Sequence, residues 1–338
     1  MNLNIVWFIL VTVLFTGFFF LEGFDYGAGM LLPFLAKKDE ERRTILNAIG
    51  PVWDGNEVWM LTAGGALFAS FPHVYATLFS GFYLALVLML LALILRGVAF
   101  EYRSLRDDAA WRGRWDWAIF AGSFLPALLW GVAVANLMRG FAIDAEMNYW
   151  GGLLPLLNPF SLLGGLVFVA LFTMHGANFL ALKVEAVVAS RARNVAFKAW
   201  IVATVLTVLF VLWSFFETDI LTKQGINGLV PALLAAIALL LSGWFGKQGK
   251  DTWAFTAGAL TVVFATLMVF MGLFPRILIS SLTPANDLTI YTAAASPYTL
   301  KVMTIVAVVF VPIVLVYQIW TYRVFRQRVK ADPKELVY

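Results

Sequence analysis

Two pairs of carboxylates carry the first chemical signal in this sequence, because both pairs fall within long, mainly apolar stretches. Glu22 and Asp25 form one pair, and Asp54 and Glu57 form the other. A spacing of three residues places both members of a pair on one face of a helix. An ionisable group inside an apolar membrane helix costs about 2.5–3.5 kcal/mol, so such groups are candidates for function. Closely spaced buried carboxylates can pass protons along a chain of water molecules.

A structural role would explain the same four residues. The second pair follows Pro51, which can open a helix, and the positive end of the helix dipole favours anions in the first turns. The first pair could lie at a membrane edge or form ion pairs with Arg96. The pattern of residues therefore leaves proton conduction and structural pairing both open.

Metal-binding chemistry has few candidate ligands in this chain. The chain contains no cysteine, which excludes disulfides, thiolate metal sites, iron–sulfur clusters and cysteine nucleophiles. His175 is the one histidine in an apolar stretch, where it could be a haem or metal ligand or a hydrogen-bonded packing residue. His73 follows Pro72 in a short turn, where we expect it to be solvated. If redox chemistry occurs, another chain is expected to hold the metal.

The composition defines the environment of these residues. Of the 338 residues, 62% are hydrophobic and 13% are charged, against about 45–50% and about 25% in soluble domains. A soluble protein of this size would have too few polar residues to cover its apolar surface, which excludes a cytosolic enzyme and a disordered chain. The apolar stretches are long, as in helices, rather than short and alternating, as in barrels. We therefore predict an all-α polytopic membrane protein.

Nine stretches are long enough to be transmembrane helices, each of which needs about 20 mostly apolar residues. The first predicted span is too long for a perpendicular crossing and is expected to tilt. The second span is the least apolar of the nine. The amino terminus lacks a basic n-region, so a cleaved signal peptide is not expected. The predicted spans cover residues 6–35, 51–71, 75–96, 115–137, 159–182, 199–216, 229–246, 253–275 and 300–322.

Lysine and arginine residues predict the orientation of the chain. All but four of the 24 basic residues follow spans one, three, five and seven or lie in the carboxyl-terminal tail. The positive-inside rule then places the amino terminus outside and the carboxyl terminus in the cytoplasm. The net charge of +4 is a topology signal, so we expect no nucleic-acid partner.

Nine spans fit two four-helix bundles and one peripheral helix. We expect one membrane domain over residues 1–338, because the sequence contains no Ser/Gly-rich linker. The first bundle is expected within residues 1–137, and the second bundle, the peripheral helix and the tail within residues 138–338. A weak similarity between residues 21–23 (LEG) and 174–176 (MHG) agrees with two related halves.

Small residues beside the carboxylates predict that the first two spans pack together. Small side chains allow two helices to approach closely in a membrane. Span one carries Gly23, Gly27 and Gly29, and span two carries Gly65 and Ala69.

Several longer motifs resemble subunit II of the cytochrome bd quinol oxidases. The first motif is residues 21–31 (LEGFDYGAGML), in span one. The second is residues 53–59 (WDGNEVW), which is followed by residues 61–69 (LTAGGALFA). The third runs from residues 79–83 (FSGFY) to residues 95–103 (LRGVAFEYR). The motifs lie in the same order as in the family, and the rest of the chain is similar in length and number of spans.

The resemblance implies a heterodimer with subunit I in the bacterial cytoplasmic membrane. In that family, subunit I carries two haems b, one haem d and the quinol-oxidising loop, and subunit II ligates no haem. The complex oxidises quinol and reduces dioxygen to water, which generates a proton motive force without pumping. We therefore expect no catalytic residue and no metal ligand in this chain. A small third subunit, membrane lipids and bound quinone are further partners that the resemblance leaves open.

The resemblance also implies roles for individual residues. Asp54 matches the family's acid at the mouth of a proton path from the cytoplasm. Glu57, Glu22 and Asp25 are the further members of the expected path, although some members of the family carry glutamine in place of Glu57.

Two tryptophans belong to the same motif. Trp59 matches a tryptophan beside the path by which dioxygen reaches haem d, and Trp53 is expected to lie on that path or to pack near it.

Two other classes of function stay open. A proton-coupled secondary transporter could use the same acids, but such proteins usually have Gly- or Pro-broken helices at matching places in two halves. Pro231, at a helix start, and Pro312, inside span nine, have no clear counterpart. A purely structural partner would use the carboxylates as helix caps and in ion pairs.

Overall fold

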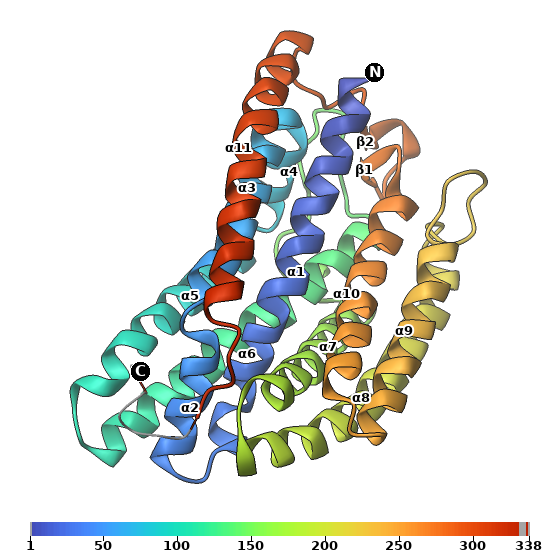
Figure 1. Ribbon diagram of the computed structural model, residues 1–338. Coiled ribbons are helices and arrows are strands. Elements are labelled where there is room, and N and C mark those ends of the chain that lie inside the picture. Colours follow the sequence, from blue (N-terminus) through green and yellow to red (C-terminus); the bar gives the residue numbers. More distant parts are fainter. Residues whose placement is uncertain (1, 331–335, 337–338) are drawn as a thin grey trace.

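The computed structural model describes residues 2–330 and 336, and these residues form a bundle of helices (Figure 1). A two-stranded antiparallel sheet and three 3-10 turns lie in the connections. Lys334, one of the basic residues of the carboxyl-terminal tail, lies outside the described residues. The α-helices are α1 Leu3–Leu35, α2 Asp39–Ile49, α3 Trp53–Ser70, α4 Pro72–Gly81, α5 Tyr83–Tyr102, α6 Ala109–Arg139, α7 Pro159–Lys183, α8 Ala186–Glu217, α9 Leu229–Lys247, α10 Asp251–Leu273 and α11 Pro297–Val324. The shorter elements are η1 Arg103–Leu105, η2 Leu154–Leu157, η3 Pro284–Asn286, β1 Arg276–Leu278 and β2 Leu288–Thr289.

The predicted all-α membrane fold is confirmed. In the described part of the chain, 8 helices are long and apolar enough to cross a membrane, namely α1 and α5 to α11. The second predicted span corresponds to α3, whose polar first turns make it less apolar than these helices. The structure divides the third predicted span into α4 and α5, with Phe82 between them.

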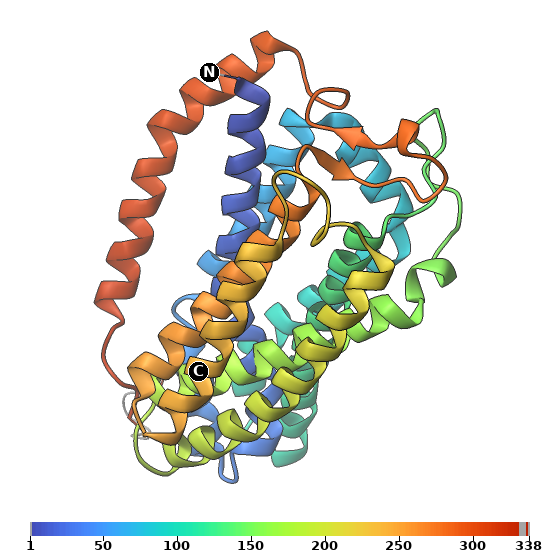
Figure 2. The same ribbon diagram turned by 90° about the vertical axis from the view of Figure 1, so that its right-hand side faces the viewer.

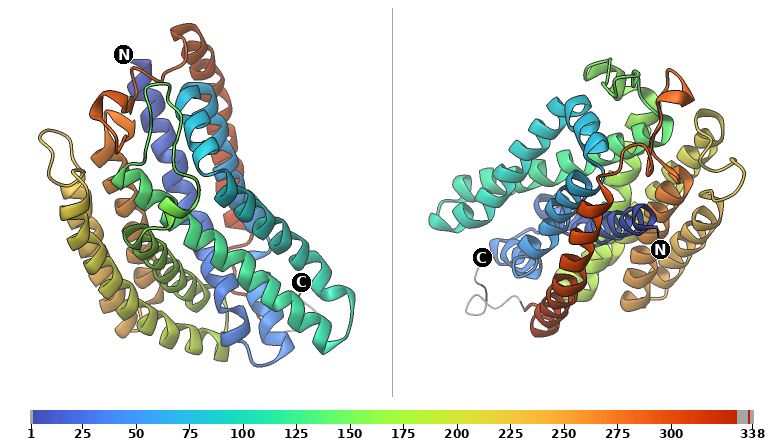
Figure 3. Two further views of the ribbon diagram at one scale, coloured as in Figure 1. Left: turned by 180° about the vertical axis from the view of Figure 1, so that it is seen from behind. Right: turned by 90° about the horizontal axis from the view of Figure 1, so that it is seen from above.

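The long helices α1 and α7 lie at the centre of the bundle (Figure 3). α1 contacts α3, α6, α7 and α10, and α7 contacts α6, α8 and α10. The two central helices meet at Gly27 and Gly176, where a Cβ atom on Gly27 would lie 2.8 Å from the Cα atom of Gly176. Glycine is therefore required at this crossing, because a side chain would separate the two backbones.

Contact between the first two predicted spans is present, because α1 packs against α3. The small residues that predicted it do not form it. Two of the three named glycines of α1 face α7, and the third faces α6. No described atom of another element lies within 4 Å of the place of a Cβ on Gly65. The helices instead meet where Gly17 lies against the ring of Trp59.

The last helix, α11, stands at one side of the bundle (Figure 2). Within α11, all of whose residues are described, Leu300 is the one buried residue. Near its start, Nε1 of Trp7 donates a hydrogen bond to Oγ1 of Thr304 at 3.1 Å. Just beyond its end, Nζ of Lys183 donates to the carbonyl oxygen of Gln327 at 2.8 Å. This helix is the predicted peripheral helix, and polar contacts fix its two ends.

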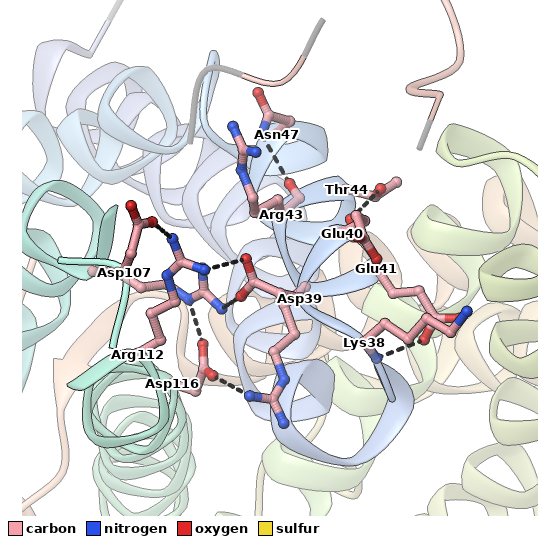
Figure 4. A network of polar contacts seen from close by, with 12 residues as sticks. Lys38, Asp39, Glu40, Glu41, Arg43, Thr44, Asn47, Asp107, Arg112 and Asp116 are labelled. Atoms are coloured by element: carbon pink, nitrogen blue, oxygen red, sulfur yellow. Dashed lines mark hydrogen bonds and ion pairs between the residues drawn. The ribbon is translucent and has the colours of Figure 1, made fainter. Parts of the chain in front are cut away.

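The short helix α2 is fixed to the neighbouring elements by ion pairs (Figure 4). Asp39 pairs with Arg103 at 2.7 Å and with Arg112 at 2.9 Å. Asp116 of α6 pairs with Arg103 at 2.6 Å and with Arg42 of α2 at 2.9 Å. α2 lies between the first two predicted spans and was not predicted, because at 11 residues it is too short for a span.

A further ion pair connects α2 to α8. Nη1 and Nη2 of Arg191 donate to the two carboxylate oxygens of Glu41, each at 2.8 Å. These hydrogen bonds and those from the main-chain N–H groups of Lys37 and Lys38 lower the pKa of Glu41 to about 2. We call the end of the bundle that carries α2, η1 and the connections from α7 to α8 and from α9 to α10 the basic end.

Candidate functional site

Charged side chains from three helices lie together between α1, α3 and α5. We call Glu22, Asp25, Glu57 and Arg96 the carboxylate–arginine cluster. Glu22, Asp25 and Arg96 are completely buried, and 20% of the Glu57 side chain is exposed. Nη1 of Arg96 forms an ion pair with Oε1 of Glu22 and lies 3.9 Å from Oε2 of Glu57. One guanidinium group of α5 thus faces carboxyl groups of both α1 and α3.

Aromatic rings surround the guanidinium group of Arg96. Its Cζ atom lies 4.9 Å from the ring centre of Tyr26, 5.9 Å from that of Trp53 and 5.6 Å from that of Phe100. A cation over an aromatic face is stabilised by the ring quadrupole, and more so where water is excluded. Trp53 also stacks on Phe100 with ring centres 5.0 Å apart. The structure therefore makes Trp53 part of the wall of the cluster.

Asn56 connects Asp25 to α11. Nδ2 of Asn56 donates a hydrogen bond to Oδ2 of Asp25 at 2.7 Å, and Asn56 is completely buried. Oδ1 of Asn56 accepts hydrogen bonds from the hydroxyl group of Tyr322 at 2.7 Å and from Nε2 of Gln318 at 3.4 Å. The peripheral helix thus reaches the carboxylate–arginine cluster through one buried amide.

The two carboxylates of α3 have different environments. Asp54 is exposed in the first turn of α3, at the basic end, whereas Glu57 lies one turn further along. Glu57 interacts electrostatically with both Asp54 and Arg96. The four predicted carboxylates therefore run from the surface at Asp54, through the partly exposed Glu57, to the buried pair of α1. The structural alternative also agrees with two of these positions. Asp54 lies in the first turn of a helix, and Glu22 forms an ion pair with Arg96.

Several buried polar atoms around the cluster have no hydrogen-bond partner in the described part of the chain. Such atoms are uncommon in proteins and mark places where ordered water can bind, if the site is polar and large enough. They come from α1, α3 and α5. The atoms are Oε2 of Glu22, Oδ1 of Asp25, the hydroxyl of Tyr26, Nε1 of Trp53, and Nε and Nη2 of Arg96.

Trp59 lies on the side of α3 that faces α1 and α11. Its ring packs on Gly17, and its Nε1 donates a hydrogen bond to Oε1 of Gln318 at 2.7 Å. The next residue along α3, Met60, lines an apolar cavity of about 930 Å³ together with Phe15 and Phe19 of α1. Trp59 is thus the neighbour in sequence of a cavity-lining residue but is not itself part of the lining.

His175 is completely buried in α7, where it makes a hydrogen bond and aromatic contacts. Its Nε2 lies 3.1 Å from the carbonyl oxygen of Phe20, and its ring stacks on Phe255 with ring centres 4.9 Å apart. Among the described residues, no group of three or more His, Cys, Asp or Glu side chains is arranged to hold a metal ion. His175 has the contacts of a packing residue, and His73 is exposed at the start of α4.

The structure adds residues that the sequence did not single out. Tyr26 and Asn56 lie within the motifs, next to predicted acids, but neither has a charge that would mark it. Gln318 and Tyr322 are four residues apart in the last apolar span. A polar pair at this spacing shares a helix face and is the one local signal that could have identified them.

The fold and the cluster define a helical membrane protein with a buried group of ionisable side chains, of which Glu57 is partly exposed. The family model for cytochrome bd terminal oxidase subunit II matches residues 3–325. Cytochrome bd ubiquinol oxidase subunit 2 from Bacillus subtilis is 44% identical over 328 residues, which cover 97% of each chain. Cytochrome bd-I ubiquinol oxidase subunit 2 from Escherichia coli K12 is 39% identical over 365 residues, which cover 98% of this chain and 96% of that one.

A solved structure shows the same fold. A chain of the bd oxidase from Geobacillus thermodenitrificans superposes with a TM-score of 0.80 at 16% identity, covering 96% of this chain and 99% of that one. The chain belongs to the cytochrome bd terminal oxidase subunit II family. It is a subunit of an oxidoreductase complex of the respiratory chain, and its family implies a complex with subunit I. This membership decides against a secondary transporter as the class of protein.

Proposed function

We propose that this subunit conducts protons from the cytoplasm to the dioxygen-reducing centre of subunit I. Reduction of dioxygen to water consumes protons, and hydrocarbon does not deliver them. A polar path through the helices is therefore needed, and ionisable residues inside membrane segments commonly form such paths. The observation that carries the proposal is the change in exposure along the four carboxylates, from exposed Asp54, through partly exposed Glu57, to the buried Glu22 and Asp25.

Unpartnered buried atoms support the presence of water along this series. Asp25 and Glu22 each have one carboxylate oxygen without a partner among the described residues, and Tyr26 contributes an unpartnered hydroxyl group. A water molecule needs two to four polar neighbours, which these groups can provide. Arg96 offsets part of the repulsion between the carboxylates of α1 and α3.

In this proposal the haems and quinol oxidation belong to subunit I. The family implies two haems b and one haem d, and the contacts of His175 support their placement in subunit I. The best candidate ligand, His175, has its Nε2 at hydrogen-bond distance from the carbonyl of Phe20 and its ring stacked on Phe255. Quinol oxidation outside and proton uptake from the cytoplasm would generate a proton motive force without pumping.

The orientation that this requires places the basic end in the cytoplasm and the amino terminus outside. Positive residues are concentrated on cytoplasmic loops of membrane proteins, which supports this orientation. A small third subunit, lipids and bound quinone are further partners in the proposal.

We also propose that dioxygen reaches subunit I beside Trp59 and Trp53. Dioxygen is apolar and needs no polar lining, so the apolar cavity beside Met60 suits it. The polar path and the apolar space would then follow one another along α3, because Glu57 and Met60 are three residues apart and share a face of that helix.

Replacement of Asp54 tests the proton path. In the assembled complex, Asp54→Asn is expected to leave the haem absorption spectrum unchanged and to lower quinol-dependent oxygen consumption about tenfold or more, because the proton donor at the entrance is lost. Glu40→Gln is the matched control, because Glu40 is an exposed carboxylate at the same end of the bundle. Wild-type oxygen consumption by a fully assembled Asp54→Asn complex would exclude the role of Asp54.

A further inference from the structure

Trp59 begins a series of hydrogen bonds that passes through α11 and ends on Asp25. Nε1 of Trp59 donates to Oε1 of Gln318 at 2.7 Å, and Nε2 of Gln318 donates to Oδ1 of Asn56 at 3.4 Å. Nδ2 of Asn56 donates to Oδ2 of Asp25 at 2.7 Å. The series therefore leaves α3, crosses to α11, returns to α3 and ends on α1.

The indole group gives this series one direction, because it can donate a hydrogen bond but cannot accept one. An amide side chain, by contrast, can turn either its oxygen or its nitrogen to a neighbour. Gln318 must present its oxygen to Trp59, which leaves its nitrogen for Asn56. Asn56 then turns its oxygen to α11 and its N–H group to Asp25. The hydroxyl group of Tyr322 donates to the same oxygen of Asn56 and favours the same orientation.

The atom that Asn56 turns toward Asp25, either its amide nitrogen or its amide oxygen, determines which protonation state of the Asp25 carboxyl group is stabilised. An N–H group stabilises an ionised carboxylate, whereas an amide oxygen would accept a hydrogen bond from a protonated carboxyl group. Asp25 and Asn56 are both completely buried, so bulk water cannot replace the lost donor. The other titratable or charged groups near Asp25 are Glu22 of α1, Glu57 of α3, Arg96 of α5 and Tyr322 of α11.

We propose that Gln318 and Tyr322 of α11 are positioning residues, which hold Asn56 as a donor to Asp25 and thereby set how tightly Asp25 binds a proton. The inference rests on the proposed function, because it concerns one step of that proton path. It gives the peripheral helix a part in proton transfer. It also gives Trp59 a second role, as the donor that orients the two amides.

Infrared spectroscopy of the assembled oxidase complex during a pH titration tests the inference. The C=O stretching band of a protonated carboxyl group that disappears in Asp25→Asn belongs to Asp25. Gln318→Met keeps the length of the side chain and removes its polar end, and Tyr322→Phe removes the hydroxyl group alone. Tyr317→Phe is the matched control, because the Tyr317 side chain lies on the same helix and is 64% exposed.

We expect the midpoint of the Asp25 band to move upward by about one pH unit, a tenfold increase in proton affinity, in both Gln318→Met and Tyr322→Phe. The midpoint should not move in Tyr317→Phe. An unchanged midpoint in both test variants, or no Asp25-dependent band in any of the proteins, would overturn the inference.

Oxygen consumption by Asp25→Asn separates this inference from the proposed function. Full turnover in Asp25→Asn would exclude Asp25 from the proton path, independently of the midpoint of the Asp25 band in the α11 variants. Reduced turnover together with unchanged midpoints in the α11 variants would retain the path and reject the positioning role.

Discussion

Removal of the Arg96 guanidinium group is expected to destabilise the complex more than removal of both Arg96 and its partner. Arg96 is completely buried and pairs with Glu22, so Arg96→Met leaves a buried carboxylate without its counter-charge. Loss of one partner of a buried ion pair costs about 3–5 kcal/mol, whereas replacement of both partners is often nearly neutral. We therefore expect a large decrease in the thermal unfolding midpoint for Arg96→Met and recovery of part of it in Glu22→Leu/Arg96→Met, in which Asp25 and Glu57 still lack the counter-charge of Arg96.

Thermal unfolding of the purified complex, followed by tryptophan fluorescence, measures this for the wild type, both single variants and the double variant. Arg114→Met is the control for loss of a positive charge, because Arg114 of α6 is exposed. If the double variant is as unstable as Arg96→Met, the ion pair with Glu22 is not the main contribution of Arg96 to the stability of the complex. The contacts with Tyr26, Trp53 and Phe100 would then be its main contribution.

Two further predictions concern the ion pair of α2 and the crossing of the central helices. Because Arg191 lowers the pKa of Glu41 to about 2, Glu41 stabilises the folded chain above its usual pKa of 4.5 and loses this effect as the pH falls toward 2. The difference in unfolding midpoint between wild type and Glu41→Gln should shrink on acidification below pH 4.5, and a growing difference would contradict the assignment. Gly27→Ala should lower the yield of assembled complex in size-exclusion chromatography by separating α1 from α7, at a cost of about 1–3 kcal/mol or more. Gly246→Ala should not, because no described atom of another element lies within 4 Å of its Cβ position, and equal yields would refute the packing argument.

Hydropathy predicted the long helices well, because about 20 apolar residues are enough to identify a membrane span. It located their ends less well. The span predicted over 199–216 is part of α8, which begins at Ala186, because the helix continues through a polar and basic segment that hydropathy does not detect. α2 was missed for a similar reason, since it is amphipathic and packs on one face alone. The division into a single domain with bundles before and after residue 137 stays a prediction.

The candidate site was predictable as a set of residues but not as a geometry. Apolar surroundings and a spacing of three residues identified Glu22 and Asp25. The residues that neutralise and orient them come from distant parts of the chain, with Arg96 lying 74 residues from Glu22 and Tyr322 lying 266 residues from Asn56. Helix packing brings these groups together, and no local pattern encodes it.

The two central helices, α1 and α7, each carry a pair of polar side chains three residues apart, but the two pairs differ in chemical type. Glu22 and Asp25 of α1 have the same spacing as His175 and Asn178 of α7. The α7 pair makes hydrogen bonds between uncharged groups, since Nδ2 of Asn178 donates to the hydroxyl oxygen of Ser242 at 3.3 Å. The α1 pair instead consists of two carboxyl groups, whose ionised form has a large cost inside a membrane unless a counter-charge lies nearby.

Arg96 lies beside the α1 pair and provides a counter-charge to Glu22. If polar contacts served only to pack the central helices, α1 could use hydrogen bonds between uncharged side chains, as α7 does. The carboxylate–arginine cluster lies next to α3 and α11, and the exposed Asp54 is one helical turn from Glu57 in α3. Because packing alone does not require charged groups, this asymmetry supports the proposed role of the α1 pair in proton transfer.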